Sequence, residues 1–434
     1  MDADDPLWAS EPIRGLVRRH DVGNLVRQVR QSQRIKQSEL AERVAVSTST
    51  VSRFENIPPG RSPDLNLAKQ LAANLGIPSH VLGAALGVGG IASSSVTPLA
   101  EASEGEDQIQ RRRFLTLAGL ALPGMVLRDL DYALAGVAPS IDAPPGAMRS
   151  RFAAAKEMYD RGENLALLNR LPALLTLADQ SLKSGSQADL EQYCAVHDLA
   201  TDVLDKVGLV GEANVTARNS VRVSRETGSA RVMAAADRGL SIVLRHQGKF
   251  HTANKVSERA AQLIEATGLE LDREAIAYVQ ALCTHAYVAA QNEARDDAIS
   301  AIVEAGKVAS YMQTRMRAPA STLATAKVRM YGVSVHWALG DNGTAVQWGR
   351  KVDINALPTP ERRARHYTDM ARAFWSWQKP DDAAISLLHA WSYAPEEVRD
   401  RPKISAIVQK LTREHGRLRS VTQLAEHYAA LTKR

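Results

Sequence analysis

The sequence predicts an all-α protein, in which a linker joins a small N-terminal helical domain to a larger body of helical repeats. Aromatic residues make up only 5% of the 434 residues, while alanine and leucine, which favour helices, are abundant. Residues 36–56 contain two short helical patterns with a tight connection, and from about residue 150 helices and turns recur to the end. A chain of this length can hold two or three domains, each with its own core.

Residues 36–56 (KQSELAERVAVSTSTVSRFEN) predict two helices that cross at a steep angle. In residues 37–44, and again after Ser47 at Val51 and Phe54, apolar residues lie three or four positions apart. Ser47 can cap the second helix, because its hydroxyl accepts a hydrogen bond from a free N–H of the first turn. So short a connection presents the second helix outward, which is the arrangement of a helix-turn-helix that reads the major groove of DNA.

Three further helices complete a five-helix domain, to which we assign residues 11–86. Residues 22–33 predict the first helix of this domain. Residues 62–75 predict the fourth, which starts with a serine and a proline and stops at a glycine, and a short fifth helix follows. Residues 1–10 are acidic and lack a helical pattern, so we expect a mobile arm there.

The net charge of the chain is concentrated in this domain. Residues 11–61 contain ten basic and five acidic residues, so +5 of the total charge of +6 lies in them. A small basic domain on a nearly neutral body is typical of proteins that bind nucleic acid.

Several residues of the helix pair form a pattern that fixes the helices and the turn together, namely Gln37, Leu40-Ala41, Val46-Ser47, Thr50-Val51-Ser52 and Phe54-Glu55-Asn56. With this pattern, residues 22–86 resemble the Cro/phage-repressor (Xre-like) helix-turn-helix family. One departure is Ile57-Pro58-Pro59, where the family often has a glycine, and it concerns the path of the chain after the second helix. The resemblance implies that double-stranded DNA is a partner.

The second helix, Thr48–Glu55, is the expected recognition helix. Because Val51 and Phe54 face inward, the exposed positions are Thr48, Ser49, Ser52 and Arg53. In the resembling family these positions contact base edges. Arg53 can bind O6 and N7 of a guanine with two hydrogen bonds, which contributes about 1–3 kcal/mol of discrimination.

Other residues of the domain are expected to position it on DNA. The resemblance implies that Gln37 holds a phosphate or a first base. Candidates for contacts with the DNA backbone, which carry no sequence information, are Arg43, Asn56 and Lys36. We expect Glu55 to brace the domain rather than to contact DNA.

Residues 87–149 predict a flexible linker that contains one short apolar helix, within residues 111–135. Glycine, serine and acidic residues dominate residues 87–110, and no periodicity is present. Residues 111–124 (RRRFLTLAGLALPG) resemble a twin-arginine export signal, but they lie far inside the chain and their apolar run is shorter than the about 20 residues that span a bilayer. We therefore expect this helix to dock on another domain or subunit.

Residues 150–434 predict a solenoid of helix pairs. Five turns are each followed by an alanine just inside the next helix, and these alanines are 40, 45, 47 and 38 residues apart: Ala213, Ala253, Ala298, Ala345 and Ala383. A small residue there lets the second helix approach the first. One helix pair cannot bury its apolar face alone, so the pairs stack.

The repeats resemble tetratricopeptide repeats, with longer spacings, and only three of the five turns contain the expected glycine (Gly208, Gly248 and Gly340). The arrangement also resembles actinobacterial regulators that join an Xre-like domain to such a body. In these solenoids the first helix of each pair lines the concave groove. Groove positions that could bind a ligand are Arg238, Arg245, Tyr287, Gln291, Lys327, Trp337, Arg372 and Trp375.

No pattern in the sequence predicts catalysis, a metal site or a cofactor. The eleven histidines form no metal-ligand spacing, and GVGG at residues 87–90 lacks the lysine of a phosphate-binding loop. Cys194 and Cys283 belong to no cysteine cluster and are expected to be structural thiols in a reducing compartment. We therefore expect that the protein is not an enzyme.

The sequence favours a cytoplasmic, sequence-specific transcription regulator that binds DNA as a homodimer. Its repeat body would dimerise and sense a peptide or small-molecule signal. A second hypothesis is a scaffold whose repeats bind a partner protein, with DNA binding as an anchor. A third, a regulator tethered to a membrane through residues 114–127, is the least favoured, because no signal peptide is present and the apolar run is short.

Overall fold

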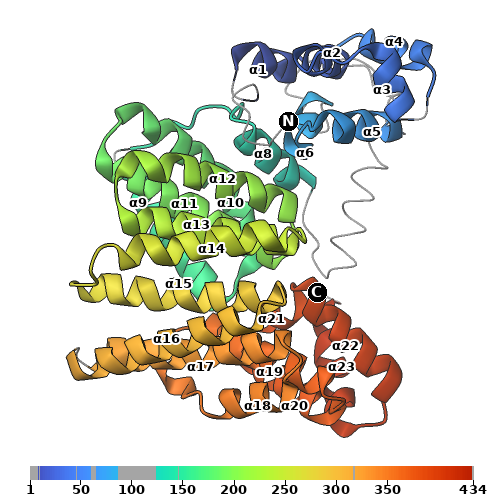
Figure 1. The fold of residues 1–434 in the computed structure, drawn as a ribbon. Helices are drawn as coiled ribbons and strands as arrows, with labels where there is room; N and C mark the ends of the chain where they lie inside the picture. The colour runs from blue at the N-terminus through green and yellow to red at the C-terminus, as the bar shows by residue number, and fades with distance from the viewer. Residues whose placement is uncertain are drawn as a thin grey trace. The chain divides into compact units, whose positions relative to one another are not determined.

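In a computed structural model, the part of the chain that is described comprises residues 8, 10–44, 46–59, 65–86, 124–144, 146–315 and 318–432, and its regular elements are all helices. The chain divides into two compact units (Figure 1). The first contains the described residues up to Pro144 together with residues 169–180. The second contains residues 146–168 and 181–432. The predicted all-α class is confirmed.

The first unit contains the five predicted helices, α2 to α6, around one hydrophobic core. Their bounds are α2 (Val22–Ser32), α3 (Gln37–Arg43), α4 (Thr48–Glu55), α5 (Leu65–Leu75) and α6 (Ser79–Ala85). The core draws on every one of them, with fully buried residues such as Leu25, Leu40, Val51 and Leu71. Helices α2 and α4 approach closely, because a β-carbon at Gly23 would lie 2.8 Å from the carbonyl oxygen of Phe54.

Two further helices belong to this unit. Helix α1 (Glu11–Arg18), which the sequence analysis did not predict, packs on α2 and α6 and buries Ile13 and Val17. Trp8 is only 9% exposed and lies in the same core, so the expectation of a mobile arm is wrong at this residue. The amphipathic pattern of α1 is only two turns long, and Trp8 is fixed by distant residues, so local periodicity does not reveal them.

Helix α8 (Gly124–Leu134) is the described part of the predicted apolar helix, whose residues 111–123 lie outside the described ranges, as do residues 87–110. It packs against α6, and a β-carbon at Gly83 would lie 3.3 Å from Asp131. Tyr132 contributes to the core of the first unit. Of the helices in the described ranges, none combines the length and the apolar composition that crossing a membrane requires.

The second unit is built from helix pairs. It begins with α9 (Ala147–Arg161) and the ends of α10 (Asn164–Ser181), whose residues 169–180 belong to the first unit, and continues with five pairs whose partners pack on each other (Figure 1). These pairs are α11 (Gln187–Lys206) with α12 (Val210–Ser224), α13 (Ala230–His246) with α14 (Phe250–Glu265), α15 (Asp272–Gln291) with α16 (Arg295–Arg315), α17 (Ala318–Ala338) with α18 (Asn342–Arg350), and α19 (Pro360–Ser376) with α20 (Pro380–Tyr393). Three terminal helices follow: α21 (Pro395–Arg399), α22 (Pro402–His415) and α23 (Arg419–Thr432).

The first helices of successive pairs pack side by side, α11 on α13, α13 on α15, α15 on α17 and α17 on α19, which makes this unit a solenoid. All five predicted turns have the same backbone form. The residue at the glycine position is left-handed in each, including Glu293 (φ 61°) and Gln378 (φ 59°). The backbone N–H of the residue directly after it donates to a carbonyl five residues earlier at 2.8–3.0 Å. The five turn alanines are all 0% exposed. The repeat geometry is therefore retained even where glycine is absent.

The solenoid closes on itself through one buried ammonium group. Lys206, near the end of α11, donates to Glu361 in α19 at 2.8 Å and to Glu397 in α21 at 2.7 Å, and all three side chains are at most 4% exposed. The ring of Tyr159 from α9 lies 4.1 Å from the same ammonium. We call Lys206, Glu361 and Glu397 the clasp. It joins the first and the last of the five pairs.

The two carboxylates of the clasp stabilise the charged form of Lys206. Burial opposes ionisation of Lys206, but Glu361 and Glu397 outweigh this effect and raise its pKa. Arg362 lies 3.6 Å from Glu361 and Arg401 lies 3.7 Å from Glu397, so the second carboxylate charge is also compensated.

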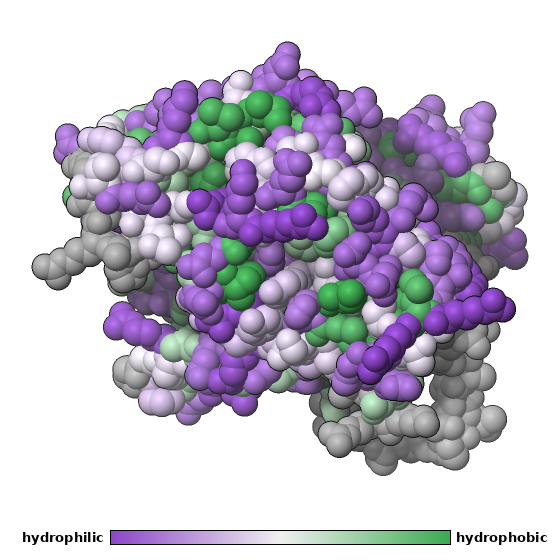
Figure 2. All heavy atoms as spheres, turned by 90° about the horizontal axis from the view of Figure 1, so that it is seen from below, coloured by the Kyte–Doolittle hydropathy of each residue, from purple (hydrophilic) through white to green (hydrophobic). Residues whose placement is uncertain are grey.

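The surface of the chain is mixed in polarity on the face drawn in Figure 2. Apolar side chains gather there in several separate patches, with polar side chains between them. Scattered apolar residues of this kind are normal on folded proteins and do not by themselves indicate a docking site.

If the clasp stabilises the repeat body, removing its lysine should lower the free energy of unfolding, and neutralising its two glutamates should restore part of it. Lys206→Met should remove the nearest cation from two buried carboxylates, which would keep only Arg362 and Arg401 at 3.6 and 3.7 Å, and should cost about 3–5 kcal/mol, seen as a lower thermal midpoint in calorimetry. Adding Glu361→Gln and Glu397→Gln should recover part of this loss, because both buried carboxylates are then replaced by neutral amides, while Arg362 and Arg401, which lose their partners, are 33% and 11% exposed. A triple variant that is less stable than Lys206→Met would contradict the role given to the clasp.

Candidate functional site

Helices α3 and α4 form the predicted helix-turn-helix. The side chain of Ser47 accepts a hydrogen bond from the backbone N–H of Thr50 at 3.2 Å, and Ser47 has extended backbone angles, so it caps α4 as expected. Val51 and Phe54 are 0% and 2% exposed and hold the inner face of α4 in the core. Sequence and local chemistry therefore fix both where α4 starts and how it is rotated.

The outer face of α4 carries the predicted base-reading residues. Thr48, Ser49 and Arg53 are exposed, and Ser52 is half-buried. The Nε atom of Arg53 donates to the carbonyl oxygen of Ser49 at 3.3 Å. Neither of its terminal nitrogens bonds to another described residue, so both are free to bind a base.

The buried carboxylate of Glu55 connects helices α2, α3 and α4. Glu55 from α4 is 1% exposed and binds Arg30 from α2 through two oxygens at 2.5 and 2.9 Å. It also accepts a hydrogen bond of 2.7 Å from the side-chain nitrogen of Gln37, at the start of α3. Burial disfavours the charged form of Glu55, but the hydrogen bonds from Arg30 and Gln37 and the nearby arginine charges outweigh it and lower its pKa. We call Glu55, Arg30 and Gln37 the Glu55 network.

The other residues predicted to contact DNA differ in whether they already form hydrogen bonds or ion pairs within the domain. Gln37 uses one N–H for Glu55, which leaves a second N–H of its amide group for a phosphate. Lys36 is exposed at the N-cap of α3. Arg43 is exposed and pairs with Glu39 at 2.6 Å, and Asn56 donates to the carbonyl oxygen of Ser52 at 2.7 Å.

The structure adds Arg27 to this surface, which the sequence analysis missed. Its guanidinium binds the side-chain oxygen of Asn56 at 2.5 Å and lies 3.7 Å from Glu55, while a third of its side chain remains exposed. The signal was present in the sequence, since Arg27 precedes Arg30 by three positions and so lies on the same face of α2.

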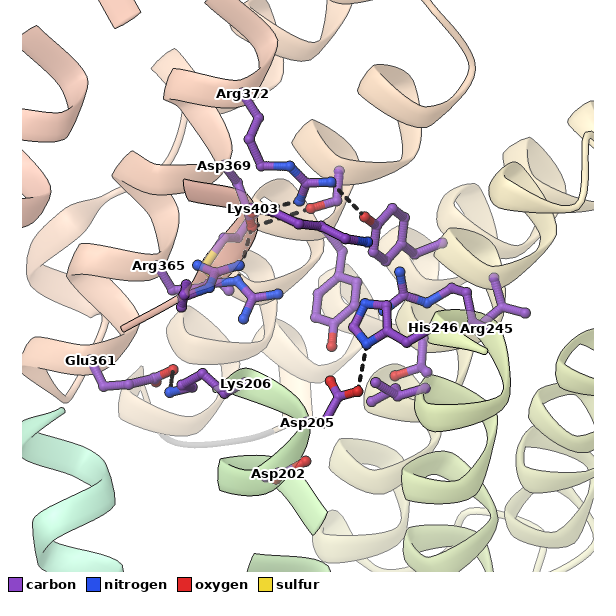
Figure 3. A pocket seen from close by; sticks show the side chains of 18 of the residues that line it. Asp202, Asp205, Lys206, Arg245, His246, Glu361, Arg365, Asp369, Arg372 and Lys403 are labelled. Atoms are coloured by element: carbon purple, nitrogen blue, oxygen red, sulfur yellow. Dashed lines mark hydrogen bonds and ion pairs between the residues drawn. The ribbon is translucent and has the colours of Figure 1, made fainter. Parts of the chain in front are cut away.

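In the second unit, four of the predicted ligand residues line one cavity of about 250 Å³: Arg238, Arg245, Tyr287 and Arg372 (Figure 3). Two others touch these four. The ring of Trp337 lies 3.7 Å from the guanidinium of Arg372, and the side chain of Gln291 accepts from Arg245 at 3.4 Å. Six of the eight predicted ligand residues, from α13, α15, α17 and α19, therefore lie in or beside one cavity.

Lys327 and Trp375 do not line this cavity, and in this respect the predicted groove needs correction. The pKa of Lys327 is lowered to about 8, by burial and by the charges of Arg362 and Arg238. Trp375 packs edge-on against His415 from α22. Both lie on first helices of pairs, and spacing from the turn does not determine how each helix is rotated, so counting from the turns cannot tell which side chains line the cavity.

Charged groups dominate the cavity. Eight basic residues line it (Lys206, Arg238, Arg245, Arg362, Arg365, Arg372, Arg401 and Lys403) against four carboxylates (Asp202, Asp205, Glu361 and Asp369). Lys403 and Arg401 were missed, because they lie at the start of α22 and just before it, outside the repeats from which groove positions were counted. The cavity therefore has a surplus of positive charge.

The Glu55 network predicts a pH-dependent effect. Glu55→Gln should leave Arg30 buried without a carboxylate, destabilise the first unit by about 3 kcal/mol and speed amide exchange in α2 and α4 of the full chain. Because folding lowers the pKa of Glu55, its contribution is present above the unfolded value of about 4.3 and is lost as the pH falls through the folded value. The difference in exchange between wild type and variant should therefore stay large from pH 7 down to about pH 4.3 and shrink below that. A difference that grew on acidification would contradict the network.

Comparison with known proteins identifies the first unit more closely than the second. Residues 26–82 match the helix-turn-helix family, a segment that contains α3, α4 and α5 with most of α2 and of α6. No curated protein matches the chain significantly. The N-terminal part of this protein is thus a helix-turn-helix domain of the Xre/Cro-like kind.

Proposed function

We propose that this protein is a cytoplasmic, sequence-specific transcription regulator that binds an inverted repeat in DNA as a homodimer. The observation that carries the proposal is the outer face of α4, where neither terminal nitrogen of Arg53 bonds to a described residue, on a helix whose inner side the Glu55 network joins to α2 and α3. The local net charge of +5 in residues 11–61 supports attraction to DNA.

The dimeric state follows from the size of the reading surface. One α4 helix offers four candidate base contacts, Thr48, Ser49, Ser52 and Arg53, which is a small number for a tight and selective complex. Two copies on one face of the duplex would place their half-sites about 34–36 Å apart, one helical turn, or a multiple of it. An inverted repeat is the DNA symmetry that matches a two-fold dimer.

The repeat body would bind the signal molecule that controls DNA binding. Its cavity is lined by charged and aromatic residues and is of a size that suits a small molecule or part of a peptide. A ligand can change DNA binding only if it binds more tightly to one arrangement of the dimer than to the other. A scaffold that binds a partner protein is the alternative, and recovery of a stoichiometric protein partner without any ligand effect on DNA binding would favour it.

Two substitutions separate base reading from backbone contact. With the full chain and a site selected from random DNA, Arg53→Ala should lower the preference for that site by about 1–3 kcal/mol. Lys36→Ala should weaken binding to selected and scrambled DNA equally and reduce the salt dependence by about one charge. Fluorescence anisotropy at several salt concentrations measures both, and light scattering checks that the variants keep their oligomeric state. If Arg53→Ala weakened both DNAs equally, the base-reading role of Arg53 would be excluded.

A further inference from the structure

Three cationic side chains from separate helices lie in one part of the cavity. Arg245 comes from α13, Arg372 from α19 and Lys403 from α22 (Figure 3). Tyr287 lies among them: its hydroxyl accepts a hydrogen bond of 3.1 Å from Arg372, and its ring lies 4.5 Å from the guanidinium of Arg245. We call Arg245, Arg372 and Lys403 the cationic cluster. It exists only because the solenoid closes and brings α22 to α13.

The carboxylates of the cavity do not neutralise this cluster. Asp369 is shared between Arg365 at 3.4 Å and Arg372 at 3.2 Å, and Asp205, which bonds to His246, lies near enough to Lys403 to raise its pKa, so two carboxylates face three cations and Arg365. Among the residues that the structure describes, neither Arg245 nor Lys403 has an ion-pair partner. Positive charge in this part of the cavity therefore exceeds negative charge.

The environment of the cluster favours an anion. Arg245 is only 6% exposed, and its Nε atom has no hydrogen-bond partner among the described residues. Burial and the charges of Arg245 and Arg372 lower the pKa of Lys403, and Tyr287 and Asp205 only partly oppose this effect. Although burial alone would raise the pKa of Tyr287, the charges of Arg372 and Arg245 lower it below its ordinary value. An anion bound here would reduce the electrostatic repulsion among Arg245, Arg372 and Lys403 and would accept hydrogen bonds from their unpartnered N–H groups.

We propose that Arg245, Arg372 and Lys403 bind the phosphate group of a small phosphorylated molecule. Arg245 has an unpartnered Nε, and each terminal nitrogen of Arg372, which donates one N–H to Asp369 or Tyr287, carries a second N–H. These N–H groups can bind several oxygens of a tetrahedral oxyanion, and the ammonium of Lys403 adds a third charge, which suits a phosphate dianion better than a single carboxylate. The remainder of the cavity includes Ile242, Met330 and Tyr331, which suit an uncharged body. The role of this molecule as a signal rests on the proposed regulatory function, whereas its binding does not.

Titration calorimetry of the full chain in phosphate-free buffer tests the site. Inorganic phosphate and phenyl phosphate should bind, and acetate should bind more weakly than either. Lys403→Met should weaken phosphate binding about tenfold or more, because it removes one charge-assisted hydrogen bond. Lys249→Met is the matched control, since Lys249 is an exposed lysine outside the cavity, and it should leave the affinity unchanged.

The free protein supplies a second readout. Lys403→Met removes an uncompensated cation, so it should leave the thermal midpoint of the ligand-free chain unchanged or raise it, whereas a structural role for Lys403 would lower it. The inference is overturned if neither phosphate compound binds at millimolar concentration, if acetate binds as tightly as phosphate, or if both lysine variants behave alike. Selection of DNA is measured separately, so failure of phosphate binding and failure of the proposed DNA function are distinguishable.

Discussion

The repeat body depends on the contact between one lysine and two glutamates that are far away in the sequence. Lys206 lies 155 residues from Glu361 and 191 residues from Glu397, and all three are buried. A buried ammonium is tolerated only where carboxylates surround it, so this contact restricts how the first and last helix pairs can meet. Residues from α11, α13, α15, α17 and α19 line one cavity beside this contact.

The helix-turn-helix domain uses a buried charge in a similar way. Glu55 holds α2, α3 and α4 together through Arg30 and Gln37, and it leaves the outer face of α4 without structural duties. In both units, charged groups that fix the fold are paired and buried, whereas some groups assigned to binding have N–H groups without a partner among the described residues. Arg53 in the first unit and Arg245 in the second are the clearest examples. Gln37 and Arg372 have both roles, because each bonds within its unit and still carries further N–H groups.

Much of the fold could be predicted because it depends on local patterns. The five turns were found from small residues at fixed places, and the cap at Ser47 from a side chain that acts within one helical turn. Trp8 and the clasp could not be found in this way, because their partners are distant in the sequence, and α1 was missed because its pattern is only two turns long. The cavity shows the same limit: Arg245 and Tyr287 were found by counting from the turns, but Lys403 lies on α22, outside the repeats, and Lys327 and Trp375 are not among the lining residues.

The central claim is that the chain recognises particular DNA sequences, and mapping the DNA that the protein binds in living cells tests it most directly. The account predicts discrete sites, reproducible between cultures and absent from a strain without the protein. These sites should share an inverted repeat whose half-sites lie one helical turn, or a multiple of it, apart. Binding spread evenly over the genome, or sites that share no sequence, would contradict the account.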